Sequence, residues 1–140
     1  MFYKIRKLIN KIPRPAFVIG RKRLYVEKIL VEFQIPLLFI CRDFWKNKYA
    51  VECTDEVYLK YIITDTTNKD ILDMLNAKCT MYEFMKRGKK RWFIISGQTI
   101  KYDKIKEVKS FEDKWLPKKD AYYEYISKDI KNYINKLENE

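Results

Sequence analysis

The sequence predicts an α+β fold: an antiparallel sheet of about five to six strands, two short helices between strands, and a C-terminal amphipathic helix. Residues 35–41 are the longest continuous apolar run, and their length and Leu, Ile and Phe content are typical of a strand buried on both faces. Residues 24–33 alternate along the chain as a strand does. Thr80, with Glu83 three residues later, is typical of a capped helix start.

Length and composition indicate one domain with a substantial core. The chain has 140 residues, of which 47% are hydrophobic and 16% aromatic. Lys and Arg number 30 against 19 acids, which gives a net charge of +11. This excess favours an anionic partner, which is a nucleic acid, a nucleotide or an acidic protein surface. A lysine-rich composition on solvated faces explains the same charge without any partner.

The charge pattern divides the chain into a basic N-terminal arm (residues 1–23), an α+β domain (24–118) and a C-terminal helical segment (119–140). Residues 1–12 carry apolar side chains at helical spacing and no acid, so they predict a short basic helix that ends at Pro13. This helix either binds phosphates or an anionic membrane surface, or docks on the sheet. Residues 121–137 predict a helix whose apolar face packs on the domain or forms a homodimer.

A hairpin is expected after the apolar strand. If Asn47 is its centre, Cys41 lies opposite Cys53, and Arg42 lies opposite Glu52. The thiol pair is then either a redox switch or, as we favour, two small buried apolar groups.

The remaining elements follow from alternation and turn residues. Gly97 and Gln98 have the order of a two-residue type II′ turn. The expected elements are a strand over 57–64, a helix over about 70–76, a second short helix after Thr80, a hairpin of 91–96 with 99–103, and an irregular segment or edge strand within 104–114.

Several classes of chemistry are excluded or disfavoured. The chain has no histidine, which excludes Cys-His and Ser-His nucleophile pairs and argues against zinc. Cys41, Cys53 and Cys79 are odd in number and have no C-x-x-C spacing, which is typical of reduced thiols. No signal peptide or transmembrane segment is predicted, so we expect a cytoplasmic protein without metal or cofactor.

Two basic stretches are the best candidates for binding an anion. The second ends in Trp92, on which a base could stack, although this side chain could also pack inward. The predicted binding residues are Arg21, Lys22, Arg23, Lys86, Arg87, Lys89, Lys90, Arg91 and Trp92.

No catalytic residues are predicted for the binding module. The alternative is a histidine-free, metal-dependent nuclease-type toxin that uses Asp103, Glu107 and Lys109, since such enzymes cluster carboxylates with a Glu-x-Lys triplet. In a chain this rich in Glu and Lys, such triplets also arise by chance.

The order of elements resembles a small domain of unknown function that is found in bacteria and phages. The resemblance spans residues 24–125 and rests on the first two strands, on Tyr82-Glu83-Phe84 before a Lys/Arg turn, and on Trp115-Leu116-Pro117. The chain lacks the glycine expected at Gln34-Ile35. The resemblance implies an antiparallel α+β fold, and it carries over no catalytic residues. Our hypothesis for the function is a binding module of bacterial or phage origin that acts in phage–host defence or counter-defence.

Overall fold

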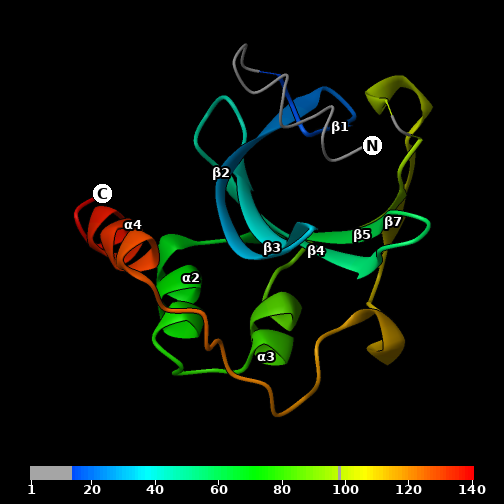
Figure 1. Ribbon diagram of the computed structural model, residues 1–140. Helices are drawn as coiled ribbons and strands as arrows, with labels where there is room; N and C mark the ends of the chain where they lie inside the picture. The colour runs from blue at the N-terminus through cyan, green and yellow to red at the C-terminus, as the bar shows by residue number, and fades with distance from the viewer. Residues whose placement is uncertain (1–13, 98) are drawn as a thin grey trace.

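A computed structural model of the protein describes residues 14–97 and 99–140. The predicted helix over residues 1–12 therefore lies outside the described residues. The fold is α+β, as predicted, and within these ranges it contains seven antiparallel strands in sequence order (Figure 1). The strands are β1 (Phe17–Ile19), β2 (Lys22–Phe33), β3 (Ile35–Arg42), β4 (Lys48–Asp55), β5 (Lys60–Thr66), β6 (Arg91–Ile95) and β7 (Lys104–Val108).

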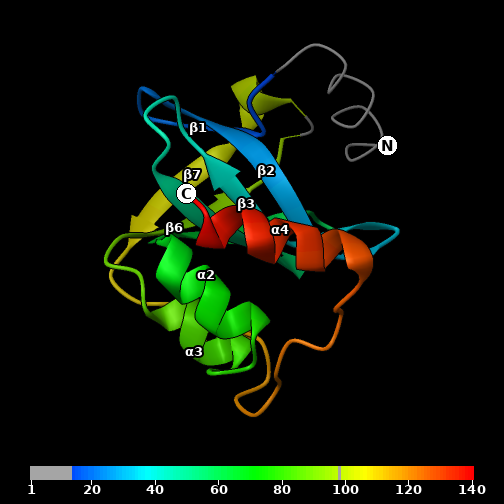
Figure 2. The same cartoon turned by 90° about the vertical axis from the view of Figure 1, so that its left-hand side faces the viewer.

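Three helices pack on the sheet within the described ranges, namely α2 (Asn68–Leu75), α3 (Met81–Lys86) and α4 (Lys128–Glu138). Two short 3₁₀ turns, η1 (Ile100–Tyr102) and η2 (Asp113–Trp115), flank β7. The sheet curls into a nearly barrel-shaped layer, and the helices lie outside it (Figure 1). Figure 2 shows α4 lying across the outer side of the sheet beside α2.

The curl of the sheet is concentrated in its long second strand. Pairing between β2 and β3 shifts register at Val26/Lys28, at Ile29/Val31 and at Val31/Glu32. Extra residues of this kind bend a strand and increase its twist, so β2 can curve around the edge of the layer.

Alternation along each strand produces two cores. Side chains on the concave side, such as Phe17, Phe39 and Tyr61, pack together inside the curl with ring centroids 5.4 to 6.3 Å apart. Side chains on the outer side, such as Ile40 and Ile62, are covered by α2, α3 and α4. The prediction that β3 is buried on both faces is therefore confirmed, since it contributes to both cores.

The helix caps follow the sequence signals. Thr80 accepts a bond from the Glu83 amide, and the Glu83 carboxylate accepts one from the Thr80 amide, so the predicted capping box is present. Thr67 caps α2 by accepting from the amide of Asp70. Both short helices thus begin where local chemistry satisfies their first amides.

The number of strands differs from the prediction of five to six because β1 forms within the segment assigned to the basic arm. Phe17 pairs with Leu24, and both are fully buried in the concave core. The arm contributes to the sheet from residue 17 onward.

The predicted register of the β3–β4 hairpin is wrong. Cys41 faces Tyr49 and Arg42 faces Lys48, which centres the turn on Trp45 rather than Asn47. Asp43 causes this by accepting the amides of Trp45 and Asn47, both at 2.9 Å, which closes the turn two residues early.

Two other strand predictions also change. Val57 is exposed in the β4–β5 turn, and β5 begins at Lys60. Residues 99–103 do not form a strand: η1 occupies their centre, and the partner of β6 is β7. The edge-strand alternative for residues 104–114 is confirmed for Lys104–Val108.

The last helix starts at Lys128, seven residues later than predicted, with Ser127 as its N-cap. Tyr123 explains the delay, because its hydroxyl donates to the carbonyl of Leu30 at 2.7 Å and holds the preceding segment extended against β2. The apolar face of α4 is buried on its own chain through Ile130, Tyr133 and Leu137. Within the described residues, no helix is long and apolar enough to cross a membrane.

Candidate anion-binding site

The antiparallel order gathers the basic stretches at one rim of the sheet. Strands β2, β4 and β6 begin at this rim, and β3, β5 and β7 end there. We call it the basic rim and define it by residues 21–23, 42–48, 65–69 and 86–91. Both predicted basic stretches, residues 21–23 and 86–91, therefore lie at the same rim.

A pocket of about 660 Å³ opens at the basic rim. We call it the lysine pocket because five lysines line it, with two acids among the other lining residues. The lining residues are Lys22, Lys46, Asn47, Lys48, Tyr49, Asp65, Thr66, Thr67, Asn68, Lys69, Lys90, Trp92 and Glu140.

Lys48 is the most buried of these cations, and its position is fixed by two acids. Its ammonium lies 3.0 Å from Glu27 and 2.8 Å from Glu140, and the side chains of Lys48 and Glu27 are only 7% and 6% exposed. Tyr133 on α4 donates to the same Glu27 carboxylate at 2.6 Å. Lys48 therefore connects the sheet to α4 as well as lining the pocket.

Glu140, two residues after the end of α4, already places a carboxylate among the lysines. Its Oε1 accepts from Lys48 Nζ at 2.8 Å and from Asn68 Nδ2 at 3.0 Å. These two donors hold the pKa of Glu140 below its usual value. The pocket thus stabilises one negatively charged oxygen supplied by the chain itself.

Two features of α2 and β5 add to the pocket's preference for anions. The first turn of α2 contributes Thr67, Asn68 and Lys69 to the lining, so the positive end of its dipole faces the pocket. The hydroxyl of Thr66 is buried and has no hydrogen-bond partner among the described residues. A buried polar group without a partner is unusual and is satisfied when a ligand or water reaches it.

Two aromatic side chains from the core on the concave side of the sheet, Tyr49 and Trp92, line the pocket. Trp92 and Tyr49 meet edge to face with their ring centroids 6.2 Å apart, and Trp92 is buried. The Tyr49 hydroxyl donates to Asp43 and accepts from Lys22. Burial and the nearby Asp43 carboxylate raise the pKa of Tyr49 to about 12, so this hydroxyl stays protonated.

Three of the predicted binding residues, Lys22, Lys90 and Trp92, line the pocket. The turn before β6 positions Lys90, because the amides of Lys89 and Lys90 both donate to Asp65, at 2.7 and 2.8 Å. Gly88 permits this approach, since a Cβ there would lie 1.8 Å from the Thr64 hydroxyl. Trp92 packs inward, as the alternative reading of the sequence held.

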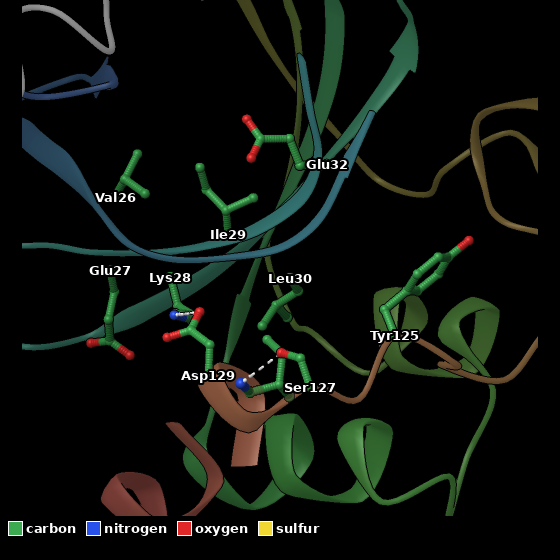
Figure 3. Close-up of a pocket in the computed structure, with 10 residues that line it drawn as sticks. Val26, Glu27, Lys28, Ile29, Leu30, Glu32, Tyr125, Ser127 and Asp129 are labelled. Atoms are coloured by element: carbon green, nitrogen blue, oxygen red, sulfur yellow. Dashed lines mark hydrogen bonds and ion pairs between the residues drawn. The ribbon is translucent and has the colours of Figure 1, made fainter. Parts of the chain in front are cut away.

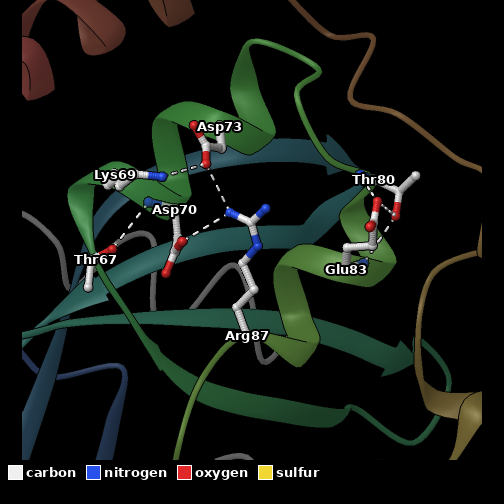
Figure 4. Close-up of polar contacts among 7 residues, drawn as sticks. All are labelled: Thr67, Lys69, Asp70, Asp73, Thr80, Glu83 and Arg87. Carbon is white, nitrogen blue, oxygen red and sulfur yellow. Dashed lines mark hydrogen bonds and ion pairs between the residues drawn. The ribbon is translucent and has the colours of Figure 1, made fainter.

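Other predicted binding residues have partners within the protein. Arg87 lies between Asp70 and Asp73 at 3.0 Å from each, and so connects α3 to α2 (Figure 4). Arg91 donates to the carbonyls of Lys86 and Lys109. These contacts give Arg87 and Arg91 structural roles.

The four remaining predicted residues lie on the surface of the basic rim. Lys86 donates to the hydroxyl of Tyr82. Arg21, Arg23 and Lys89 are exposed.

Sequence reasoning missed the residues that come from the β3–β4 turn and from α2. Lys46 and Lys48 reach the pocket because Asp43 closes the turn beneath them. The run Trp45-Lys46-Asn47-Lys48 contained a usable signal, since two lysines beside an aromatic in a tight turn suggest an exposed basic site. No pattern in the residues around Glu140 indicates that it lines the lysine pocket.

The nuclease alternative receives no geometric support. Asp103 precedes β7 and accepts the amide of Gly97, whereas Glu107 lies four residues further along the strand, about 13 Å away at the usual rise. Lys109 follows the end of β7. Among the described residues, no group of three or more His, Cys, Asp or Glu side chains could hold a metal ion.

A second pocket, of about 480 Å³, lies between β2 and the segment leading into α4. Its lining includes three acids, Glu27, Glu32 and Asp129, and one cation, Lys28 (Figure 3). Lys28 forms an ion pair with Asp129 across this groove. Its charge is thus opposite to that of the lysine pocket, and Glu27 connects the two through Lys48.

The cysteines do not form the predicted cross-strand pair. Cys41 is buried in the concave core opposite Tyr49, and Cys53 pairs with Tyr61 on β5. Burial raises the pKa of Cys53 to about 11 and also raises that of Cys79. Thiols in this state are weak nucleophiles, which favours the reading of small buried apolar groups.

Comparison of the chain with known protein families, with curated proteins and with solved structures finds no match.

Proposed function

We propose that the protein is a non-enzymatic binding module that holds a phosphate-bearing partner in the lysine pocket. The observation that carries this proposal is the convergence of five lysines, from four separate segments, on one concave site. The bacterial and phage setting implied by the resemblance remains a prediction, and binding does not depend on it.

The shape of the pocket favours phosphate over an acidic protein surface. Its volume of about 660 Å³ lies within the range of about 300–1,000 Å³ that is usual for small-ligand sites. A phosphate group can enter such a site and contact several ammonium groups at once. Carboxylates spread over a convex protein surface would reach only its mouth.

Charge supports the same preference. The two lining acids already accept hydrogen bonds from the protein: Asp65 accepts two backbone amides, and Glu140 accepts from Lys48 and Asn68. The five lysines of the lining outnumber these two acids, so the pocket keeps an excess of positive charge. Ammonium groups are suitable for phosphate because they act as compact point charges with several donors.

Titration calorimetry with inorganic tripolyphosphate tests the proposal. We expect binding at low salt, with an affinity that falls steeply as salt rises, because each phosphate contact releases counterions. Absence of binding at low salt would overturn the proposal. A salt-independent affinity would also contradict it, since it would exclude ammonium–phosphate contacts as the main interaction.

A further inference from the structure

The β3–β4 turn beside the lysine pocket is held rigidly by one buried acid. Asp43 accepts hydrogen bonds from the amides of Trp45 and Asn47 and from the Asn47 side chain, at 2.9 to 3.0 Å. Its own amide donates to the carbonyl of Asn47 at 3.0 Å. Lys46 adopts a positive φ of 67°, which these bonds maintain. The conformation of the turn is thus determined before any ligand arrives.

This turn holds two aromatic side chains in solvent. Phe44 is 79% exposed and Trp45 is 74% exposed, and their rings meet edge to face at 5.4 Å. Exposing two adjacent large apolar side chains is unfavourable, and the turn that exposes them is closed by the bonds to Asp43. Adjacent exposed aromatics on a fixed turn are typical of a contact surface.

The aromatic pair directly precedes two residues that line the lysine pocket. Lys46 and Asn47, the next residues after Trp45, line the pocket, as do Lys22 and Lys90 from β2 and β6. A stacking platform beside a cationic groove is the combination that binds single-stranded nucleic acids, since every base has a π-face and every link has a phosphate. In a duplex, the bases stack on one another and do not present free faces.

We propose that the partner is a single-stranded nucleic acid whose bases stack on Phe44 and Trp45 while its phosphates occupy the lysine pocket. This inference rests on the proposed function and adds the class of partner to it. An anionic membrane would also attract lysines and aromatics. The concave position of the lysines favours the nucleic acid, because a flat membrane surface does not enter a pocket.

The opposite rim provides a matched control. The β4–β5 turn also exposes an aromatic, Tyr58, which is 68% exposed, and it is also closed by an aspartate, since Asp55 accepts the amides of Val57 and Tyr58. Glu56 lies in that turn instead of a row of lysines. Tyr58→Ala therefore removes an exposed aromatic without touching the lysine pocket.

The experiment measures binding of a labelled oligothymidylate of about 12 nucleotides by fluorescence anisotropy. The probe is compared with an abasic oligomer of the same length and with the corresponding duplex. The full chain, Trp45→Ala and Tyr58→Ala are tested, and circular dichroism checks that each variant is folded. Tripolyphosphate titration of the same variants reports on the pocket alone.

We expect Trp45→Ala to weaken oligothymidylate binding by about tenfold or more, and Tyr58→Ala to leave it unchanged. Trp45→Ala should not change the affinity for tripolyphosphate or for the abasic oligomer. Equal oligothymidylate affinity for the full chain and Trp45→Ala would overturn the inference while leaving the proposed function intact. Binding to phosphatidylserine vesicles in place of the oligomer would also overturn it. If the full chain without substitutions bound neither tripolyphosphate nor any of the oligomers, the proposed function itself would be overturned.

Discussion

The two rims of the sheet are built alike and differ in charge. At each rim a tight turn is closed by an aspartate, Asp43 or Asp55, that accepts two backbone amides, and each turn exposes one or two aromatic side chains. The basic rim surrounds its turn with lysines and a pocket, whereas the opposite rim mixes acids such as Glu32 and Glu56 with a few lysines. An aspartate-closed turn with an exposed aromatic thus occurs at both rims, and the distribution of charge distinguishes the functional candidate.

The largest expected effect comes from removing the acid that holds Lys48 in place. In Glu27→Gln a buried ammonium loses one of its two carboxylates, and we expect the free energy of unfolding to fall by about 3 kcal/mol. Urea unfolding measures this change. Glu112→Gln is the control, because the pair of Glu112 with Lys114 is exposed and should contribute less than about 1 kcal/mol. Equal effects of the two variants would show that Lys48 is effectively solvated.

Next in size is the effect of removing charge from one rim only. Replacing Lys22, Lys46 and Lys90 together with Gln should weaken oligothymidylate binding by on the order of a hundredfold at low salt and reduce the log–log salt slope by about 2. The control replaces Lys60, Lys101 and Lys104 with Gln. These lysines lie at the opposite rim, and their replacement changes the net charge by the same amount. If both triple variants weaken binding equally, the net charge of +11 matters and the pocket does not.

A smaller effect concerns stability along β4, whose outer face carries Lys48 at the basic rim and Glu52 four residues later. Glu52 is paired in register with Leu38 and Ile62, and its Oε1 has no hydrogen-bond partner among the described residues. Burial raises the pKa of Glu52 from 4.5 to about 9, so the folded protein keeps this carboxyl protonated at neutral pH.

Because the unfolded chain releases the Glu52 proton near its ordinary pKa, stability is highest below that pKa and falls as pH rises toward about 9. Glu52→Gln should remove this slope and raise stability at pH 7.5 by on the order of 1–3 kcal/mol. Urea unfolding between pH 5 and about 9 gives the measurement. A parallel pH dependence in the variant would place the titrating group elsewhere.

The smallest effect is competition within the lysine pocket. Glu140→Gln removes the internal carboxylate that shares Lys48 and Asn68, so affinity for tripolyphosphate should rise by about twofold to fivefold. Glu138→Gln, an exposed residue of α4, makes the same change in charge away from the pocket and should have no effect. A fall in affinity in Glu140→Gln would indicate that Glu140 positions Lys48 for the ligand.

The parts of the fold that the sequence predicted correctly depend on neighbouring residues. The buried run of β3 and the capping box at Thr80 are local patterns, and both are confirmed. The β3–β4 register was wrong because a side-chain acceptor, Asp43, outweighed the turn propensity of Asn47. The start of α4 was wrong because Tyr123 bonds to Leu30, a contact 93 residues away that no local pattern contains.

The candidate site was predictable only in part for the same reason. Lys22, Lys90 and Trp92 belonged to visible basic stretches, whereas Lys48, Asn68 and Glu140 meet only in three dimensions. Arg87 illustrates the opposite error, because it looked available in the sequence and is held by two aspartates in the structure. Composition indicated what kind of surface to look for, and topology determined which cations form it.

The meander order of the sheet has a kinetic consequence. Each strand pairs with its neighbour in sequence, so most of the sheet can form by closing short loops, which is typically fast. The α4 contacts with β2 and β4 close far longer loops, since Tyr133 and Glu27 are 106 residues apart and Lys48 and Glu140 are 92 apart. We therefore expect α4 to dock last during folding and to detach first, which would make hydrogen exchange faster in α4 than in α2 and would release Glu140 from the lysine pocket.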